Sequence, residues 1–466
     1  MKPLVFLAAA AAAGCTTVGP DYLRPEVDLP ARFSASSVEN SPAIPAEWWK
    51  LYRDATLDEL VEATRANNAD LRIAAAQVQE AEAVLRLVGA ASLPEVSVGA
   101  SRSRSRVSEL SSPPPTNTAP LTRPDSRLAA STSFEVDFWG RFDRSSEAAR
   151  ASLLATRYAQ EVVTLSLGSL TAQAYFGLRS QDAQLGVLAQ TIVARRESVE
   201  LARARLGAGL ASELDLHQAQ GALSDALVQR RETVRQRALL ERQLGSLTGR
   251  PGLALVTADL FSVPVPPMPP VGLPSTLLER RPDIRASEQV LVAANAQIGV
   301  AKAALFPSIS LTGTLGTQSA AFSDLLSSGS GIWTLGFAVA LPEFDAGRRE
   351  AAVGQAEARR IQALAAYQKS IEAGFREVAD ALVSFEQASA SEADLAERLA
   401  ASRHALRLST ERYQSGYSPY LEVLDAQRTA NEAELSFVRN RQARLAFSVD
   451  LMKALGGGWG AGAGLN

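Results

Sequence analysis

The chain has 466 residues, of which 46% are hydrophobic and 21% are charged, a balance typical of a folded protein. Its 47 Lys and Arg residues nearly balance its 50 Asp and Glu residues, so it lacks the basic excess of a nucleic-acid-binding protein. One cysteine excludes an intramolecular disulfide, and the HExxH, GxSxG and GxxxxGK[ST] motifs are absent. We therefore expect no enzyme, no catalytic residue, no metal site and no cofactor.

The chain opens with a targeting segment. Lys2 is followed by an apolar, alanine-rich stretch over residues 4–13, which is too short to cross a bilayer as a helix and has the pattern of a secretory signal. Residues 1–14 are therefore predicted to be a signal peptide. Small residues run directly into Cys15, which resembles the bacterial lipobox, so we expect Cys15 to carry diacylglycerol and an N-acyl chain. An ordinary signal peptide followed by a chance cysteine is the alternative.

Two alternating segments in the first half predict membrane strands. Residues 127–138 alternate between an apolar face and a polar face that includes Glu135 and Asp137, and residues 96–100 alternate more weakly. Segments of about ten residues have the length that a tilted membrane strand needs. A polar loop over residues 107–124 separates the two segments. We expect the polar face, with Glu135 and Asp137, to line an aqueous lumen.

A long helical region follows. No proline occurs between Pro124 and Pro251. Apolar residues recur there every seven positions, at Leu178, Leu185, Ile192, Val199 and Leu206. This heptad pattern predicts helices packed side by side. One continuous helix over residues 141–206 would be roughly 100 Å long at 1.5 Å per residue, so we expect an elongated protein. A plain coiled-coil rod explains the heptads equally well.

The second half of the chain repeats the first. Gly140-Arg141 aligns with Gly347-Arg348, and the segment 206–209 aligns with 413–416, both at an offset of 207 residues. Each half therefore carries the same order of elements, and the chain has an internal two-fold sequence repeat.

A proline-rich connector separates the repeats. Eight of the 23 prolines lie between Pro251 and Pro282, which predicts an extended segment over residues 251–275. The connector divides a first structural repeat, residues 15–250, from a second, residues 276–455. Residues 456–466 form a glycine-rich tail.

The second repeat also predicts two strands. Residues 309–315 and 333–341 alternate, and a loop rich in Ser and Gly separates them over residues 319–331. A sheet of four such strands would have open edges, which lipid does not tolerate. We infer that several copies of the chain pool their strands into one barrel. A soluble four-stranded sheet is the alternative.

Five segments carry the motifs of a known family: residues 48–61, 280–286, 303–309, 342–349 and 413–428. In these segments the chain resembles the TolC-like outer-membrane efflux factors, in their lipoprotein branch of the OprM/NodT type. The resemblance implies a mainly α-helical homotrimer with a 12-stranded membrane β-barrel, four strands from each chain, and a long periplasmic α-helical barrel. It also implies a lipid-anchored outer-membrane exit duct of a tripartite efflux system, which works with a periplasmic adaptor and an inner-membrane pump of the resistance-nodulation-division type.

The resemblance places a gate at the periplasmic tip. The matching positions are Asp215, Tyr413, Leu421, Glu422 and Asp425. The acids and Leu421 are implied to form the constriction, and Tyr413 belongs to the network that holds it shut. Alternatively, the acids merely favour the helix dipole at their N-terminal turns. His217, one turn from Asp215, is expected to be an exposed helical residue.

Two other functions share parts of this pattern. A type I secretion channel would use the same duct, and a coiled-coil surface lipoprotein would share the heptads without conducting. The sequence leaves the substrates, the adaptor and the pump open.

Overall fold

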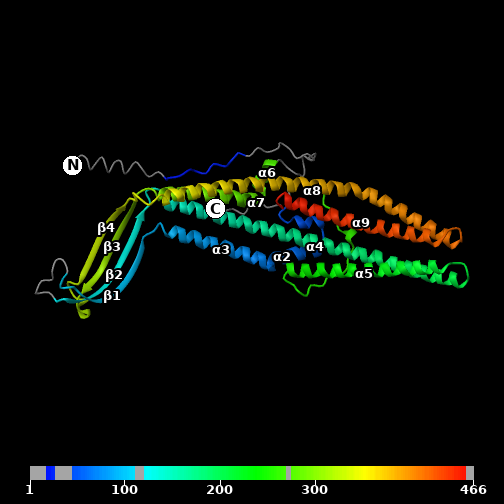
Figure 1. Ribbon diagram of the computed structural model, residues 1–466, viewed down its shortest axis with the longest axis horizontal. Coiled ribbons are helices and arrows are strands. Elements are labelled where there is room, and N and C mark those ends of the chain that lie inside the picture. Colours follow the sequence, from blue (N-terminus) through cyan, green and yellow to red (C-terminus); the bar gives the residue numbers. More distant parts are fainter. Residues whose placement is uncertain (1–16, 27–44, 111–119, 269–273, 458–466) are drawn as a thin grey trace. The chain divides into compact units, whose positions relative to one another are not determined.

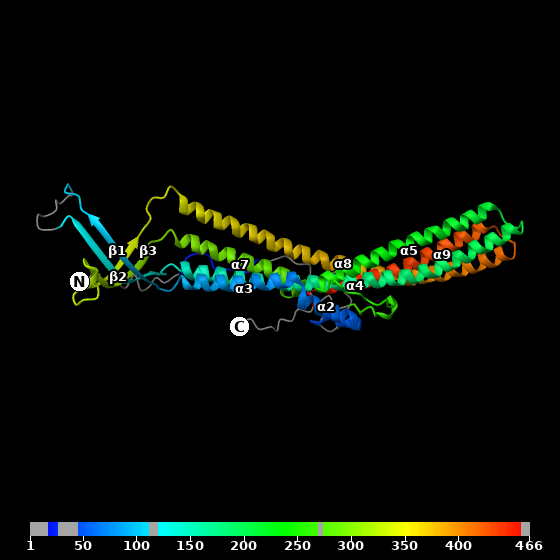
Figure 2. The same cartoon turned by 90° about the horizontal axis from the view of Figure 1, so that it is seen from below.

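Figures 1 and 2 show the computed structural model of the chain, which describes residues 17–26, 45–110, 120–268 and 274–457. The first repeat comprises the 3-10 helix η1 (Trp48–Tyr52), helices α2 (Ala55–Asn67) and α3 (Ala69–Ala90), strands β1 (Glu95–Arg106) and β2 (Thr122–Val136), and helices α4 (Arg141–Gly207) and α5 (Glu213–Leu247). The connector carries η2 (Leu260–Ser262), and α6 (Pro274–Arg280) begins at its end and runs into the second repeat. The second repeat comprises α7 (Pro282–Ala303), β3 (Ser308–Ser319), η3 (Phe322–Asp324), β4 (Gly331–Ala340), α8 (Arg348–Gln414) and α9 (Tyr420–Ala454).

Element lengths confirm that the chain consists of two similar halves. Helices α3 and α7 have 22 residues each, and strands β1 and β3 have 12 each. Helices α4 and α8 have 67 residues each, and α5 and α9 have 35 each. The continuous helix predicted over residues 141–206 is α4. The mainly helical fold with four strands per chain is therefore also confirmed.

The chain divides into two compact units, and each unit draws on both repeats. Among the described residues, unit 1 holds 17–26, 78–110, 120–156 and 287–367, and unit 2 holds 45–77, 157–268, 274–286 and 368–457. All four strands lie in unit 1, whereas α2, α5 and α9 lie in unit 2.

The strands of unit 1 form one antiparallel sheet in the order β1-β2-β3-β4 (Figure 1). The prediction for β2 was wrong at both ends, because the strand begins at Thr122 and stops at Val136. Pro124 lies inside the strand and pairs with Arg104 of β1, whereas pairing with β3 begins only at Ser126. At Pro124 the edge of β2 that faces β3 is therefore unpaired. A proline is tolerated there because no backbone N–H is needed to bond to a neighbouring strand.

An aromatic cluster fixes the start of unit 2. Trp48 and Tyr52 of η1 are buried with Tyr175 and Phe176 of α4. Tyr52 shares a hydrogen bond with Ser448 of α9 at 2.6 Å between their hydroxyl oxygens. Burying each large side chain contributes on the order of 2 kcal/mol, so this cluster holds η1 against α4 and α9.

Candidate functional site

Two helical hairpins in unit 2 carry the predicted gate residues, and their turns lie at the same end of that unit (Figure 2). Just past the end of α4 at Gly207, Gly209 has a φ of 72°, and the Leu210 amide donates to the Arg205 carbonyl at 2.8 Å. Helix α8 ends in the same way, with Gly416 at a φ of 82° and the Tyr417 amide 2.9 Å from the Arg412 carbonyl. Glycine adopts this left-handed conformation without strain, so both repeats reverse direction at the aligned position.

Asp215 caps its own helix. Its backbone amide donates to Ser212 Oγ, and its carboxylate accepts from the Ser212 amide, both at 3.2 Å. This reciprocal pair is a capping box. Helix α9 has Pro419 at the same place, which offers no side-chain cap. The helix-cap interpretation therefore holds for Asp215, and its role in a constriction stays a prediction.

Tyr413 lies in a small core between the hairpins. Its side chain is 5% exposed and packs with Val199 of α4 and Tyr420 of α9. The guanidinium of Arg205 donates to the Tyr413 carbonyl at 2.6 Å and lies 4.6 Å from the ring centroid. Burial raises the pKa of Tyr413, and the nearby Asp215 raises it further against the effect of Arg205. Tyr413 is thus held by its ring and its carbonyl.

The hydroxyl of Tyr413 takes no part in this link between the hairpins. It is buried and has no hydrogen-bond partner within the described part of the chain. Near the two turns the hairpins are linked instead through Arg205, which sequence reasoning missed. The repeat offset aligns Arg205 with Arg412, and that equivalence was an available signal.

The other gate candidates are exposed on α9. Leu421 is 59% exposed. Glu422 lies 3.5 Å from Arg412, and Asp425 lies 2.9 Å from Arg428 three positions further along the helix. Both acids therefore have a cationic neighbour, although exposed pairs of this kind are weak and are screened by salt. Sequence reasoning missed both arginines, of which Arg428 is signalled by its spacing from Asp425.

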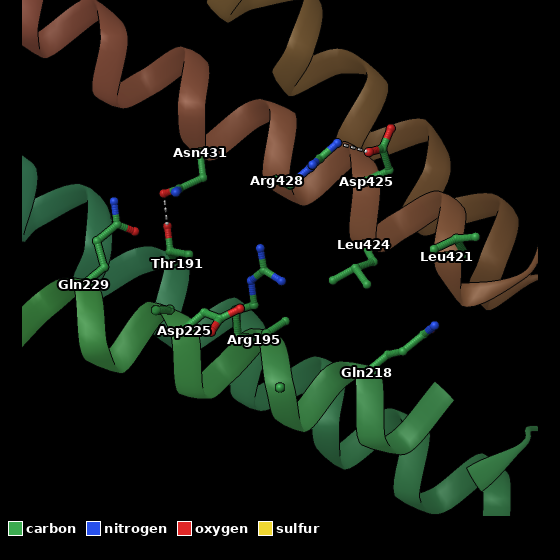
Figure 3. Close-up of a pocket in the computed structure, with 13 residues that line it drawn as sticks. Thr191, Arg195, Gln218, Asp225, Gln229, Leu421, Leu424, Asp425, Arg428 and Asn431 are labelled. Carbon is green, nitrogen blue, oxygen red and sulfur yellow. Dashed lines mark hydrogen bonds and ion pairs between the residues drawn. The ribbon is translucent and has the colours of Figure 1, made fainter. Parts of the chain in front are cut away.

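A cleft of about 630 Å³ lies between α4, α5 and α9 (Figure 3). Thr191 of α4 donates to Asn431 of α9 at 3.0 Å and links the cleft's two sides. Arg195 lies one turn further along α4, with its guanidinium pointing toward α9, and is only 7% exposed. Within the described residues it makes no hydrogen bond or ion pair, and its burial lowers the pKa of the guanidinium, against the effects of Tyr420 and Asp225. The cleft is thus polar, with a charge at its base.

The sheet of unit 1 has two chemically distinct faces. The apolar face comprises Val96, Val98, Ala100, Leu128, Ala130, Phe134, Val136, Ile309, Leu311, Leu315, Trp333, Leu335, Phe337 and Val339. The polar face is mostly Ser, Thr, Gly and Ala, as in Ser97, Ser131, Ser133, Ser310, Thr312, Thr314, Thr334 and Gly336. Trp333, Leu335 and Phe337 are 77%, 80% and 76% exposed. A whole face of exposed large apolar side chains marks a surface for lipid or protein.

The two predicted lumen acids differ in position. Glu135 belongs to the polar face of β2 and lies 2.7 Å from Arg141. Asp137 lies past the end of β2, so its placement on the strand was wrong. Its carboxylate instead accepts the amides of Arg141 and Phe142 at 2.7 and 2.8 Å and caps α4. Whether either acid lines a lumen stays a prediction.

The structure offers little for other chemistry. Within the described residues no group of three His, Cys, Asp or Glu side chains could hold a metal ion. His217 is exposed, with its Nδ1 atom 3.2 Å from the side-chain oxygen of Gln220. None of the helices in the described ranges is both long and apolar enough to cross a membrane.

Two long helical hairpins and a sheet with opposite apolar and polar faces define a channel protein of the TolC-like class. The family profile described as "Outer membrane efflux protein" matches residues 60–250 and 273–457. The chain therefore belongs to the outer membrane efflux protein family. It is an efflux channel of the outer membrane that extends into the periplasm.

Individual relatives agree with this family. The chain is 36% identical to the cation efflux system protein CusC of Escherichia coli K12, over 98% of this chain and 99% of the relative. It is 36% identical to the toluene efflux pump outer membrane protein TtgF of Pseudomonas putida, over 96% and 95%. A crystal structure of CusC matches with a TM-score of 0.86 at 33% identity, over 95% of this chain and all of that one. The open state of the Neisseria gonorrhoeae MtrE channel matches with a TM-score of 0.85 at 29% identity, over 95% and 98%.

Proposed function

We propose that three copies of the chain assemble into one duct, which receives substrate from an inner-membrane pump of the resistance-nodulation-division type through a periplasmic adaptor. The two-faced sheet carries this proposal. Its order leaves an edge of β1 and an edge of β4 unpaired within one chain. Unpaired backbone groups are costly in lipid, so pairing of β4 with β1 of the next copy would satisfy both edges.

The apolar face would then contact lipid and the polar face would line the conduit. Such a duct works by conduction, and we assign it no catalytic step. The chain is equally similar to a cation efflux protein and to a toluene efflux protein, each 36% identical. Cations and toluene share no binding chemistry, which supports selection of the substrate by the pump rather than by this chain.

We also propose that Cys15, which lies outside the described residues, anchors the protein through diacylglycerol and an N-acyl chain. The proposal is supported by the segment that follows it in unit 1. The Val18 amide donates to the Trp139 carbonyl at 3.0 Å, where β2 passes into α4. Further along, Asp21 lies 2.6 Å from Arg144, and both carboxylate oxygens of Glu288 accept from Arg24.

A cysteine two residues before Thr17 is within about 7 Å of it. A lipid on Cys15 would therefore enter the membrane near the end of the sheet at which β2 passes into α4. Cys15→Ser should lose labelling by a radioactive fatty acid, while the apolar face still allows the protein to reach the membrane. Undiminished labelling of the variant would refute the lipid assignment.

The duct is tested by a matched pair of variants on β4. Leu335→Arg places a charge on the apolar face, and Thr334→Arg places the same charge on the polar face. A cationic side chain in the middle of a lipid-facing strand costs about 2–4 kcal/mol, so only Leu335→Arg should block membrane assembly. Equal loss in both variants would contradict the assignment of the faces.

Conductance and complementation separate the remaining functions. The full chain reconstituted in a planar bilayer should conduct ions, whereas a coiled-coil surface lipoprotein would not. Restoration of drug or metal-ion resistance in a strain that lacks its own efflux duct supports the efflux role. Restoration of protein secretion alone would indicate a type I secretion channel.

A further inference from the structure

Strand β1 changes character along its apolar face. Val96, Val98 and Ala100 lie on this face near the helical end of the sheet. Arg102, Arg104 and Arg106 continue the same face, because side chains two positions apart point to the same side of a strand. All three arginines are exposed.

The register shows what surrounds these arginines. Their partners on β2 are Ser126, Pro124 and Thr122, and Ser126 pairs in turn with Ser319 of β3. The described strands carry no acidic residue on this face. The nearest acid of β2, Asp125, points to the polar face, where it accepts a hydrogen bond from Gln318 at 2.7 Å. The sheet therefore gives Arg102 and Arg104 no carboxylate.

Two neighbouring groups position the arginines without neutralising the cluster. The guanidinium of Arg102 lies 5.6 Å from the centre of the Phe322 ring. Arg106 lies 3.1 Å from Glu109 in the following loop, and both side chains are mostly exposed. Arg102 and Arg104 are therefore the two arginines of this face that form no ion pair within the described residues, whereas Arg106 pairs with the loop residue Glu109.

The position of these arginines along the strands indicates what they bind. Trp333 pairs with Leu315, which pairs with Ala130, which pairs with Val98, so these four residues form one row across the sheet. Arg102 lies two rows further from the helices. Aromatic side chains mark the edge of the apolar band in outer-membrane strands. Cations just beyond that edge on a lipid-facing surface lie at the level of headgroups.

We propose that Arg102, Arg104 and Arg106 bind the phosphate groups of anionic lipids in the outer leaflet. The inference rests on the proposed function, because it takes the apolar face as lipid-facing and the helices as periplasmic. Arginine suits this ligand because its planar donors bind two phosphate oxygens at once. Charge complementarity and continuity with the apolar face both favour a lipid over a soluble anion.

The test uses the full chain in detergent micelles that contain bisphosphorylated lipid A or its dephosphorylated form. Arg102→Ser with Arg104→Ser removes two cations from the apolar face. Arg123→Ser with Arg127→Ser removes two cations from the polar face of β2 and is the matched control. Each cation near an anionic membrane surface contributes about fivefold to binding, so the first variant should bind the phosphorylated lipid about 25-fold more weakly. The control should bind it as the wild type does.

Four further measurements decide the result. Binding of dephosphorylated lipid A should be weak and equal in all three proteins. Competition by inorganic phosphate at millimolar concentration would show that the site takes free phosphate, and would overturn the assignment to lipid. Light scattering should show that the oligomeric state is unchanged, since loss of the oligomer only in Arg102→Ser with Arg104→Ser would assign these arginines to a contact between copies. Normal conductance of this variant alongside its weak lipid binding would leave the duct intact and confirm the separate lipid site.

Discussion

Arg205 and Tyr413 join the two helical hairpins, through a hydrogen bond of 2.6 Å from the Arg205 guanidinium to the Tyr413 carbonyl. The same carbonyl accepts the amide of Gly416 in the turn that ends α8. Arg205 therefore holds the α8–α9 turn against the end of α4. Its repeat equivalent, Arg412, stays beside Glu422 at its own turn. Of these two equivalent arginines, Arg205 thus links the two hairpins, whereas Arg412 links α8 to α9 within one hairpin.

Arg205→Met should raise the resting conductance of the reconstituted channel. The substitution keeps an apolar stem over the Tyr413 ring but removes the donor to the carbonyl, which is worth roughly 1.5–3 kcal/mol for a charged donor. Arg203→Met is the control, because Arg203 has the same charge on the same helix and pairs only with the exposed Glu200. If single-channel recordings show an equal rise in resting conductance in both variants, the cause is the lost surface charge and not the lost hydrogen bond.

Tyr413→Phe should leave the resting conductance unchanged, because the hydroxyl has no hydrogen-bond partner within the described chain. Tyr413→Ala with Leu421→Ala should raise it, since loss of a buried aromatic ring costs about 3–5 kcal/mol of packing. Comparison of the two variants in planar bilayers separates the ring from the hydroxyl. A clear rise in Tyr413→Phe would mean that the hydroxyl bonds to another copy of the chain.

Glu422→Gln with Asp425→Asn should weaken block by multivalent cations added from the periplasmic side, and should lower cation selectivity. The reason is that a trimer would bring two of these carboxylates from each copy near one axis. Arg412→Gln with Arg428→Gln should have the opposite effect, because these residues are the acids' cationic neighbours. Reversal potentials in a salt gradient measure the change in selectivity, and conductance with the multivalent cation added measures the change in block. Unchanged block after the acids are neutralised would leave them as surface residues only.

Asp450→Asn should raise the thermal stability of unit 2 at pH 7. Burial raises the pKa of Asp450, and this outweighs the hydrogen bond from Gln173 and the charge of Lys453, which lower it. The Asp450 carboxyl therefore binds its proton more tightly in the native state than in the unfolded chain. Ionisation of Asp450 then costs stability as the pH rises above the ordinary value of 3.8, and that cost remains at pH 7.

The same sign predicts that the advantage of Asp450→Asn shrinks as the pH falls toward 3, where both states are protonated. Circular dichroism melts of the full chain at pH 3, 5 and 7 measure this trend. Asp394→Asn on α8 is the control, because it removes the same charge from an exposed position. An advantage of equal size at all three pH values would contradict the role of ionisation.

The sequence by itself determined the elements and their order. Period-two alternation predicted the strands, and the seven-residue recurrence of apolar side chains predicted helix α4, because both patterns follow from local backbone geometry. The repeat offset predicted that the two halves match, and the structure shows three pairs of helices and one pair of strands of equal length, whereas β2 has 15 residues and β4 has 10. The ends of β2 were harder to predict. A proline such as Pro124 usually marks the end of a strand, and only the pairing on its two sides shows that the strand continues through it.

Only the tertiary structure decided what the polar side chains do. Asp137 and Asp215 were predicted to be lumen and gate acids, and that role stays a prediction, but the structure shows that each carboxylate also accepts backbone amides at the start of a helix, at 2.7–3.2 Å. Arg205 and Tyr413 are 208 positions apart, and nothing in either segment alone shows that they meet. A side chain's hydrogen-bond partner depends on which segments the fold brings within about 3 Å, and that distance is set by packing of the hairpins rather than by sequence spacing.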